Sequence, residues 1–463
     1  MSFTRRTFLI GAGTGISVLV IAACTDPEPT PTPTSPSPSP QPPDMVPEPT
    51  RLWRSNWAAD PFSQGAVSYI PVGSDPDDRT ALRLPLRNRV FFAGEATSDD
   101  PGTVSGAMRS GATAARDVIG VAGPQELVAV VGAGAAGAEA ARLLRAFGVD
   151  VLVVEARDRI GGRIDSRAEE DGTSFEMGAW KLAAGEDPGL IADVDTRPLD
   201  GTIIVPATDG FATGSVTELA QVQEAVSAEL AMWASEQTTT DVGMASSVPD
   251  SGASAAGGVV GDIPAGVMEA LYLDAARLAA GAEPADISTW FPPAGIGEAS
   301  VIPIGQLSAV LESSLEGVTL ALATAVVAVA YDDDGVSLRL GTGESHRVDR
   351  VIVTVPLGVL KAGSIEFDPP LPLPMRSAIN TLGFGQLELV RVAFDEAFWT
   401  TDATVWSLVG ADALITTWIN LRPITGETAL LGIAAGDSAT ALSDIDDEEL
   451  TQMVRDLLAP FAG

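Results

Sequence analysis

The residues best suited to chemistry form a glycine-rich turn near the middle of the chain. Gly132, Gly134 and Gly137 have the spacing GxGxxG, and Glu155 follows 23 residues after the first of them. Glycine permits a tight turn at the first position, admits a pyrophosphate at the second, and allows close helix–strand packing at the third. A carboxylate at the position of Glu155 can accept hydrogen bonds from ribose hydroxyls. Together these residues predict a dinucleotide site.

The segments around this turn have the pattern that such a site needs. The apolar run 127–131 is typical of a buried parallel strand, and a helical stretch extends from the turn to Phe147. A second apolar run, 151–154, ends directly at Glu155. The N–H groups at the start of the helix would then face the phosphates. Because strand, turn, helix and acidic residue occur in order, we prefer a dinucleotide site over a chance Gly/Ala-rich turn.

A longer motif after the second strand distinguishes between dinucleotides. Glu155 is followed by Ala-Arg-Asp-Arg-Ile-Gly-Gly-Arg, which ends at Arg163. This extension resembles the FAD-binding signature of the flavin amine oxidases. The resemblance implies that FAD is the cofactor and that Arg163 pairs with its pyrophosphate. The residues that it assigns to FAD from this motif are Arg157, Gly161, Gly162 and Arg163.

The resemblance extends over most of the chain after residue 51. Residues 351–361 resemble the strand and turn that lead out of the family's FAD domain. The segments 382–385 and 398–399 then follow in the family's order, and Val326 matches the valine that contacts the adenine. Each segment is ordinary when taken singly. Their shared order and spacing are what make the chain similar to the family.

The segment that closes the family's sequence stands here at the front of the chain. Residues 56–66 and 89–95 match it, and a helix is predicted from Gly102 to about Ile119. The cofactor residues that the resemblance implies in this segment are Glu95, Thr103 and Val104. Each module occurs once, so we interpret the chain as circularly permuted rather than as a damaged tandem gene. The short polar stretch 120–126 would be the joint between the old ends.

Two substrate-side positions depart from the family pattern. The family's cage tyrosine corresponds to Val67, and its lysine near the flavin N5 corresponds to Leu389, so both are expected to face the substrate. The cysteine that binds flavin covalently in some relatives corresponds to Ala66, which implies non-covalent FAD. One of the chain's two lysines, Lys181, follows a segment near the flavin in relatives and could approach the site.

The first fifty residues are expected to be an export signal and a tether. Arg5 and Arg6 resemble a twin-arginine signal, and the apolar run 10–23 leads into Cys24, which resembles a lipobox cysteine. We expect export as a cell-envelope lipoprotein, with membrane contact only through lipid on Cys24. A transmembrane anchor is the alternative, but about sixteen residues are few for a bilayer core of roughly 30 Å. Residues 26–50 contain eleven prolines and predict an extended stalk.

The composition limits the classes of partner. The chain has 62 acidic and 27 basic side chains, a net charge of −35, which repels nucleic acid. This field would favour a small cationic substrate such as an amine, although acidity also serves solubility. A single cysteine excludes an internal disulfide, and a single histidine leaves little material for a Ser-His-Asp triad or a histidine-rich metal site. We expect no metal and no nucleic-acid partner, and we assign no oligomeric state.

The expected fold is α/β, with an FAD-binding Rossmann-like domain on a mainly parallel sheet and a mixed α+β substrate domain. Within the substrate domain, residues 238–261 are predicted to form a flexible loop. The predicted divisions in chain order are a signal at 1–24, a Pro-rich linker at 25–50, FAD-binding domain at 51–200 (51–120 joined to 127–200), substrate domain at 201–298, FAD-binding domain at 299–360 and substrate domain at 361–463.

The resemblance implies an FAD-dependent oxidoreductase that oxidises an amine or a similar donor by hydride transfer to flavin. No catalytic side chain is assigned, because the flavin itself accepts the hydride. With aliphatic residues at the lysine and tyrosine positions, oxidase and dehydrogenase behaviour both stay open. Two further alternatives are a non-catalytic FAD-binding protein and an oxidoreductase of the same superfamily that acts on an apolar, non-amine substrate.

Overall fold

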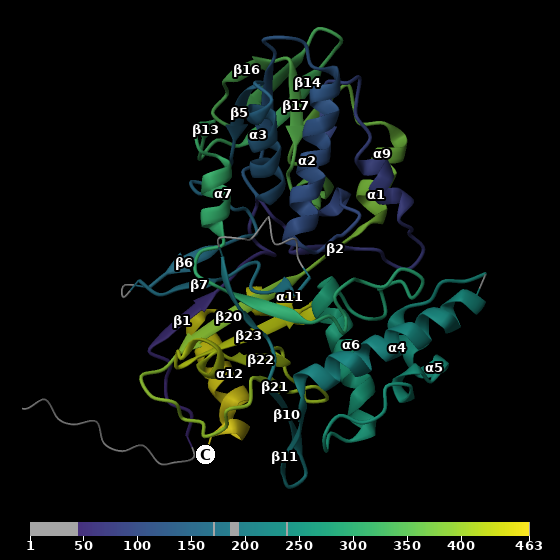
Figure 1. Cartoon of the computed structure of the whole chain (residues 1–463), viewed down its shortest axis with the longest axis vertical. Helices are drawn as coiled ribbons and strands as arrows, with labels where there is room; N and C mark the ends of the chain where they lie inside the picture. The colour runs from purple at the N-terminus through teal and green to yellow at the C-terminus, as the bar shows by residue number, and fades with distance from the viewer. Residues whose placement is uncertain (1–44, 170–171, 186–193, 238, 463) are drawn as a thin grey trace, which may run out of the picture. The chain divides into compact units, whose positions relative to one another are not determined.

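The computed structural model describes residues 45–169, 172–185, 194–237 and 239–462. These residues belong to one compact unit that is built around two large sheets (Figure 1). The predicted signal and Cys24, and almost all of the predicted linker, lie outside the described residues. No helix in the described part of the chain is long and apolar enough to cross a membrane.

The first large sheet has five strands, all parallel. Their order across the sheet is β13 (Thr319–Ala321), β5 (Asp150–Val154), β4 (Leu127–Val131), β17 (Arg350–Val353) and β3 (Val90–Phe92). The central strands β4 and β17 are buried almost throughout, as expected for continuous apolar runs in a parallel sheet. The sequence therefore predicted β4 and β5 correctly.

Helices cover one face of this sheet. They are α2 (Val104–Val121), α3 (Ala135–Ala146) and α7 (Ser308–Ser314). Figure 1 shows α2 and α3 side by side. Their close approach depends on small residues, because a Cβ on Gly111 of α2 would lie 2.0 Å from the carbonyl oxygen of Ala136 in α3.

The other face carries a smaller sheet and two helices. The elements are β14 (Val326–Tyr331), β15 (Val336–Leu340), β16 (Ser345–Val348), β18 (Glu366–Asp368), α1 (Asp77–Leu82) and α9 (Leu373–Thr381). Ile365, Met375 and Leu382 share one core with Val351 and Val353 of β17. Residues beyond the expected boundary at 361 therefore pack with the five-stranded sheet as far as Leu382, and the domain division stays a prediction.

The second large sheet has seven strands and is mainly antiparallel, with one parallel pair between β10 and β21. Their order is β1 (Arg51–Arg54), β20 (Leu387–Ala393), β23 (Ala429–Ala435), β22 (Thr417–Asn420), β21 (Val405–Ser407), β10 (Thr202–Ala207) and β11 (Gly210–Ser215). The FAD-binding domain was expected to begin at residue 51, and this division stays a prediction. The first described strand, β1, pairs with β20 in this second sheet.

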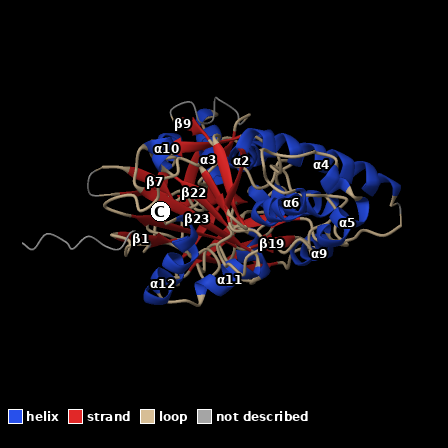
Figure 2. Cartoon of the chain, turned by 90° about the horizontal axis from the view of Figure 1, so that it is seen from below, coloured by secondary structure: helices blue, strands red, loops and turns tan. Residues whose placement is uncertain are grey.

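Side chains of the second sheet alternate between two cores, as the pleat of a strand requires. Ile203 and Val205 face a core that includes the helices α4 (Val216–Glu236), α5 (Met244–Ser251) and α6 (Ala265–Ala280). Ile204 faces the opposite core, which includes α11 (Asp437–Ser443) and α12 (Asp447–Leu458). Figure 2 shows α4, α5 and α6 gathered to one side of the strands.

Two helices of these cores have informative sequences. The stretch 446–461 has the apolar spacing of an amphipathic helix, and it contains α12, whose first turn is capped by the Asp446 carboxylate. The predicted flexible loop at 238–261 is wrong for the described residues, because α5 and a short 3₁₀ turn at 253–255 form there. Met244 and Val248 are fully buried and hold α5 in the core.

Short strand pairs lie between the two large sheets. They are β2 (Val67–Tyr69) with β19 (Gly383–Gly385), β6 (Ser166–Ala168) with β7 (Ser174–Glu176), and β12 (Ser300–Ile304) with β8 (Leu182–Ala183) and β9 (Asp195–Pro198). Figure 1 shows β2, β6 and β7 in this middle zone. These pairs bring residues that are far apart in sequence to the space between the sheets.

Candidate functional site

A large cavity, with a volume of about 1440 Å³, is bounded by both large sheets. Gly132 and Glu155 line it at the ends of β4 and β5, and Ile419 and Ile433 line it from the seven-stranded sheet. Pockets for small ligands usually enclose about 300–1,000 Å³. This cavity therefore has room for a dinucleotide and a substrate together.

The glycine turn borders the cavity in the way that a pyrophosphate needs. A Cβ on Gly137 would lie 1.9 Å from the carbonyl oxygen of Gly132, so this third glycine is required by packing within the protein. A Cβ on Gly134 would meet no protein atom closer than 3.6 Å, and Gly134 lines the cavity. Its bare backbone leaves space for a ligand. Helix α3 begins at Ala135 without a side-chain cap, so its first N–H groups are available to an anion.

The carboxylate of Glu155 stabilises this turn through two hydrogen bonds. Its Oε2 accepts a hydrogen bond from the Ala133 N–H at 2.8 Å, and its Oε1 accepts one from the Arg157 N–H at 2.8 Å. The Arg157 guanidinium in turn donates to Asp60 Oδ2 at 2.7 Å and to Ser63 Oγ at 3.0 Å. Glu155 and Arg157 both line the cavity, so the carboxylate supports the turn as well as facing the ligand space.

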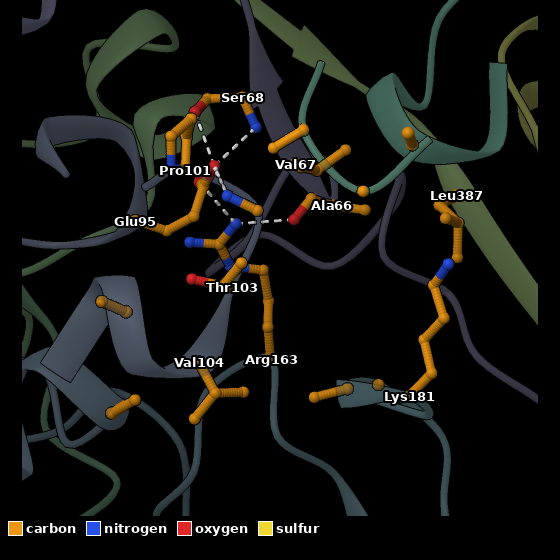
Figure 3. Close-up of a pocket in the computed structure, with 18 of the residues that line it drawn as sticks. Ala66, Val67, Ser68, Glu95, Pro101, Thr103, Val104, Arg163, Lys181 and Leu387 are labelled. Atoms are coloured by element: carbon orange, nitrogen blue, oxygen red, sulfur yellow. Dashed lines mark hydrogen bonds and ion pairs between the residues drawn. The ribbon is translucent and has the colours of Figure 1, made fainter. Parts of the chain in front are cut away.

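A second polar cluster centres on Glu95 and Arg163 (Figure 3). Arg163 Nη1 lies 3.0 Å from Glu95 Oε2 and donates to the carbonyl oxygen of Ala66 at 2.6 Å. Glu95 Oε1 accepts from the backbone N–H of Ser68 at 3.0 Å, from its hydroxyl at 2.6 Å and from the Gly102 N–H at 3.1 Å. Arg163 was predicted to pair with a pyrophosphate, and in the protein alone it pairs with Glu95. Both side chains line the cavity.

The charge of Glu95 is fixed by its neighbours. Burial by itself would raise the pKa of Glu95. The positive charges of Arg163 and Arg79, together with hydrogen bonds from Ser68, outweigh burial and hold the pKa of Glu95 below its ordinary value. Arg79 is buried and also lines the cavity, and sequence reasoning missed it. Glu95 therefore stays ionised at neutral pH and can accept hydrogen bonds from ligand hydroxyls.

The remaining predicted cofactor residues come together around the same cavity, except for Gly137. Thr103 caps α2 by accepting a hydrogen bond from the Gly106 N–H at 2.9 Å. The predicted residues that line the cavity are Glu95, Thr103, Val104, Gly132, Gly134, Glu155, Arg157, Gly161, Gly162, Arg163 and Val326. Gly137 packs against Gly132 instead of lining the cavity. Their roles toward the cofactor stay predictions.

The two predicted substrate-facing positions have different outcomes. Val67, on β2, lines the cavity as expected (Figure 3). Leu389 is fully buried in the core beside β23, where it is opposite Ile433, and it does not line the cavity. The prediction for Leu389 is thus corrected. Leu387, two residues earlier on the same strand face, is the residue of β20 that borders the cavity.

Sequence reasoning also missed a buried carboxylate at the far end of the cavity. Asp274, on α6, accepts hydrogen bonds from Thr416 Oγ1 at 2.9 Å and Thr417 Oγ1 at 3.1 Å. It also pairs with Arg277 at 2.7 Å, and it lines the cavity. A single acidic residue within the apolar stretch 271–276 was the available signal, because buried carboxylates are rare without a partner.

Comparisons with known proteins bear on the family and the cofactor. The sequence profile described as "Flavin containing amine oxidoreductase" matches residues 40–119 and 224–463. A second profile, described as "NAD(P)-binding Rossmann-like domain", matches residues 130–194. The chain is 26% identical over 362 residues to Homo sapiens lysine-specific histone demethylase 2, covering 70% of this chain and 42% of that protein. It is 26% identical over 354 residues to polyamine oxidase 4 of Oryza sativa subsp. japonica, covering 71% of each.

The solved structures add evidence on the fold alone. A triple mutant of putrescine oxidase matches with a TM-score of 0.57 and 20% identity, covering 73% of this chain and 82% of that one. The expected α/β fold with a Rossmann-like domain is thereby confirmed. The chain spans between 41% and 44% of the length of the first curated relatives that it matches.

Proposed function

Because the chain belongs to the flavin-containing amine oxidoreductase family, whose cofactor is FAD, we propose that it oxidises a small amine. FAD, when bound, accepts the hydride that leaves the carbon next to the amine nitrogen. The observation that carries this proposal is the continuity of the cavity. The same space extends from the glycine turn at Gly134 to the apolar wall at Ile419 and Ile433.

The chain's own residues would hold FAD without a covalent bond. The backbone of Gly134 and the start of α3 would receive the pyrophosphate, whose negative charge suits a helix N-terminus. Glu95 would accept hydrogen bonds from hydroxyls of the cofactor, and Arg163 would supply positive charge. Ala66 has no nucleophilic side chain, which favours release of the flavin when the protein is denatured.

Several observations favour an amine as the donor. The far wall of the cavity is apolar at Leu387, Ile419 and Ile433, and the carboxylate of Asp274 is set into it. An apolar wall excludes water from a hydride transfer, whereas the charge of Asp274 is already balanced by Arg277. The relatives named polyamine oxidase and the solved structures named for putrescine and cyclohexylamine also favour small amines.

Anaerobic reduction of the purified holoprotein tests this proposal. We expect one or more small aliphatic amines to bleach the oxidised-flavin absorbance, while the corresponding alcohols leave it unchanged. Photoreduction in the same cuvette is the control that the flavin can accept electrons. Bleaching by light but by none of the amines would reject amine oxidation and favour the non-catalytic FAD-binding alternative.

The circular permutation is also part of this proposal. Its support is the contact between the two ends of the described chain. Arg455 Nε donates to the carbonyl oxygen of Val46 at 3.1 Å, and Val46 shares a core with Val454 and Phe461. A chain that ran on from residue 461 to residue 51 would therefore need little extra length. The link between α2 and β4 is correspondingly short, from 122 to 126.

We propose, finally, that the protein is exported and anchored by lipid on Cys24. The support is the sequence pattern of paired arginines, an apolar run and a cysteine that occurs nowhere else in the chain. Fractionation of cells that express wild type or Cys24→Ser is the test. Membrane-bound, processed Cys24→Ser protein would show that lipidation is not the anchor.

A further inference from the structure

The far end of the cavity is a slot between helices α4 and α6 on one side and the seven-stranded sheet on the other. Figure 2 shows these helices on one side of the strands. The α6 side chains that line the slot are Leu271, Asp274, Ala275 and Leu278, at the spacing of one helical face. Among the described residues of α4, α6 and the seven-stranded sheet, Asp274 is the one charged side chain that lines the cavity.

The carboxylate of Asp274 already has partners within the protein. Its Oδ1 accepts hydrogen bonds from Arg277 Nη2 at 2.7 Å and from Thr416 Oγ1 at 2.9 Å. Its Oδ2 accepts one from Thr417 Oγ1 at 3.1 Å. Arg277 does not line the cavity, so a ligand in the slot would meet the carboxylate and not the guanidinium. The slot therefore presents an ion pair without net charge in an otherwise apolar or neutral lining.

Three further charged side chains line the cavity from the loops that precede β8, β10 and β12. They are Lys181, Asp200 and Glu298, and all three are exposed. Exposed charges keep much of their water and attract a ligand charge only weakly. A second ammonium group inside the slot would instead lose its water and find a carboxylate that is already paired, which is unfavourable. A hydrocarbon chain gains free energy from the same loss of water.

We propose that Arg277 is a specificity-determining residue. By balancing the charge of Asp274, it makes the slot accept an amine whose far end is uncharged and apolar, and reject a diamine with the same carbon chain. The inference rests on the proposed function in that the ligand is an amine, and it adds which class of amine the slot selects.

Titration of the wild-type holoprotein with matched amines, without oxygen, tests this selection. The flavin spectrum gives the half-saturating concentration, as a perturbation where an amine only binds and as bleaching where it is oxidised. Salt at about 0.3 M screens the general attraction of the acidic chain for cations. We expect pentylamine to half-saturate at a concentration at least about tenfold below that of cadaverine, the diamine with the same carbon chain. From propylamine to hexylamine, each added methylene should lower this concentration about threefold to fourfold.

Two substitutions of Arg277 connect the selection to the ion pair. Arg277→Met leaves the charge of Asp274 unbalanced, so it should remove the difference between cadaverine and pentylamine. Arg277→Lys keeps the positive charge and should keep the difference. Arg142→Met is the matched control, because Arg142 and Glu139 form an ion pair with the same sequence spacing and the same 2.7 Å distance in α3, and neither residue lines the cavity. It should leave the difference unchanged.

The outcomes separate this inference from the proposed function. Equal half-saturation by pentylamine and cadaverine in wild type, or a difference that survives in folded Arg277→Met, would overturn the role of Arg277. If Arg277→Met does not retain flavin, the wild-type series and Arg277→Lys still decide. Perturbation that favours pentylamine, with no bleaching by any amine, would keep the selective slot and reject amine oxidation. No spectral response to any amine would overturn both.

Discussion

At the scale of single residues, two glycines of the dinucleotide turn have different roles. One borders the ligand space, and the other is required by packing within the fold. Gly134 and Gly137 are three residues apart, yet a side chain would meet the cavity at the first and backbone at the second. We expect Gly134→Val to keep the melting temperature of the flavin-free protein but to weaken FAD binding more than about tenfold, or 1.4 kcal/mol. Gly137→Val should instead unfold the turn and cost on the order of 1–3 kcal/mol of stability.

The measurements for this pair are flavin retention on a desalting column and thermal unfolding of the stripped protein. The backbone at Gly134 is extended, with φ −79° and ψ −175°, so valine there is not strained. Equal loss of stability in both variants would contradict the assignment of Gly134 to the ligand.

The contrast between Leu387 and Leu389 gives a second residue-scale prediction, about oxygen. Neither side chain can hold a proton or a charge near the flavin, so we expect the reduced protein to be reoxidised slowly and to behave as a dehydrogenase. Leu387→Lys should be tolerated because its side chain borders the cavity. Leu389→Lys should destabilise the fold by roughly 3–5 kcal/mol, because it would bury an unpaired charge.

Stopped-flow mixing of photoreduced protein with oxygen measures the reoxidation rate directly. Wild-type reoxidation as fast as in an ordinary amine oxidase would contradict this prediction. Repeating the measurement with Lys181→Met then decides whether the cavity lysine supplies the missing charge.

At the scale of elements, one buried carboxyl joins the β6–β7 hairpin to the segment that precedes α7. Glu176, on β7, accepts hydrogen bonds through Oε1 from Ser166 Oγ at 2.6 Å and from the Leu307 N–H at 2.9 Å. Its Oε2 is buried without a hydrogen-bond partner in the described part of the chain. Burial raises the pKa of Glu176 from 4.5 to about 7.

The direction of the resulting pH dependence follows from linkage. Between pH 4.5 and 7 the folded protein holds a proton on Glu176 that the unfolded chain has lost, so this carboxyl makes the free energy of unfolding fall as pH rises. Glu176→Gln removes the effect. We expect the variant to gain stability relative to wild type across this window, by about 3 kcal/mol at most.

Urea unfolding of both proteins at pH 4.5 and pH 7.5 checks this prediction. Glu176→Asp is the matched control, because it keeps the titrating carboxyl. A stability difference between wild type and Glu176→Gln that does not change with pH would show that Glu176 titrates normally.

The elements also show what a sequence pattern can and cannot predict. β4 and α12 were predictable because their apolar periodicity and their caps are local. The pairing of β1 with β20 could not be predicted because the partner is distant in sequence, with Arg51 opposite Ala393. α5 was missed because its eight residues include three serines and Pro249, which are typical of loops. The position of Leu389 relative to the cavity depends on packing against β23, which no spacing rule contains.

At the scale of the whole molecule, the two described ends meet, and this makes the permutation testable. A variant chain that joins residue 462 to residue 45 through a short Gly/Ser linker, and opens between Ala122 and Glu126, should fold and bind FAD. Its melting temperature should lie within a few degrees of that of wild type, because the opened link is exposed or half-buried and carries no core residue.

Flavin content and thermal unfolding of the rejoined chain are the measurements. A second opening, within β23, is the control that should fail, because all seven of its residues are buried. Failure of the opening at 122–126 with FAD present would reject the permuted interpretation.

The strand order of the parallel sheet has a consequence for synthesis. All of the predicted cofactor residues except Val326 lie between Glu95 and Arg163, so most of the binding site emerges early from the ribosome. Yet β3 and β4, which come from this early segment, are not neighbours. β17 inserts between them in parallel register and emerges only at residues 350–353. Until β17 has been translated, the sheet formed by the early segment lacks the strand between β3 and β4. We therefore expect stable binding of the flavin only after most of the chain has been translated.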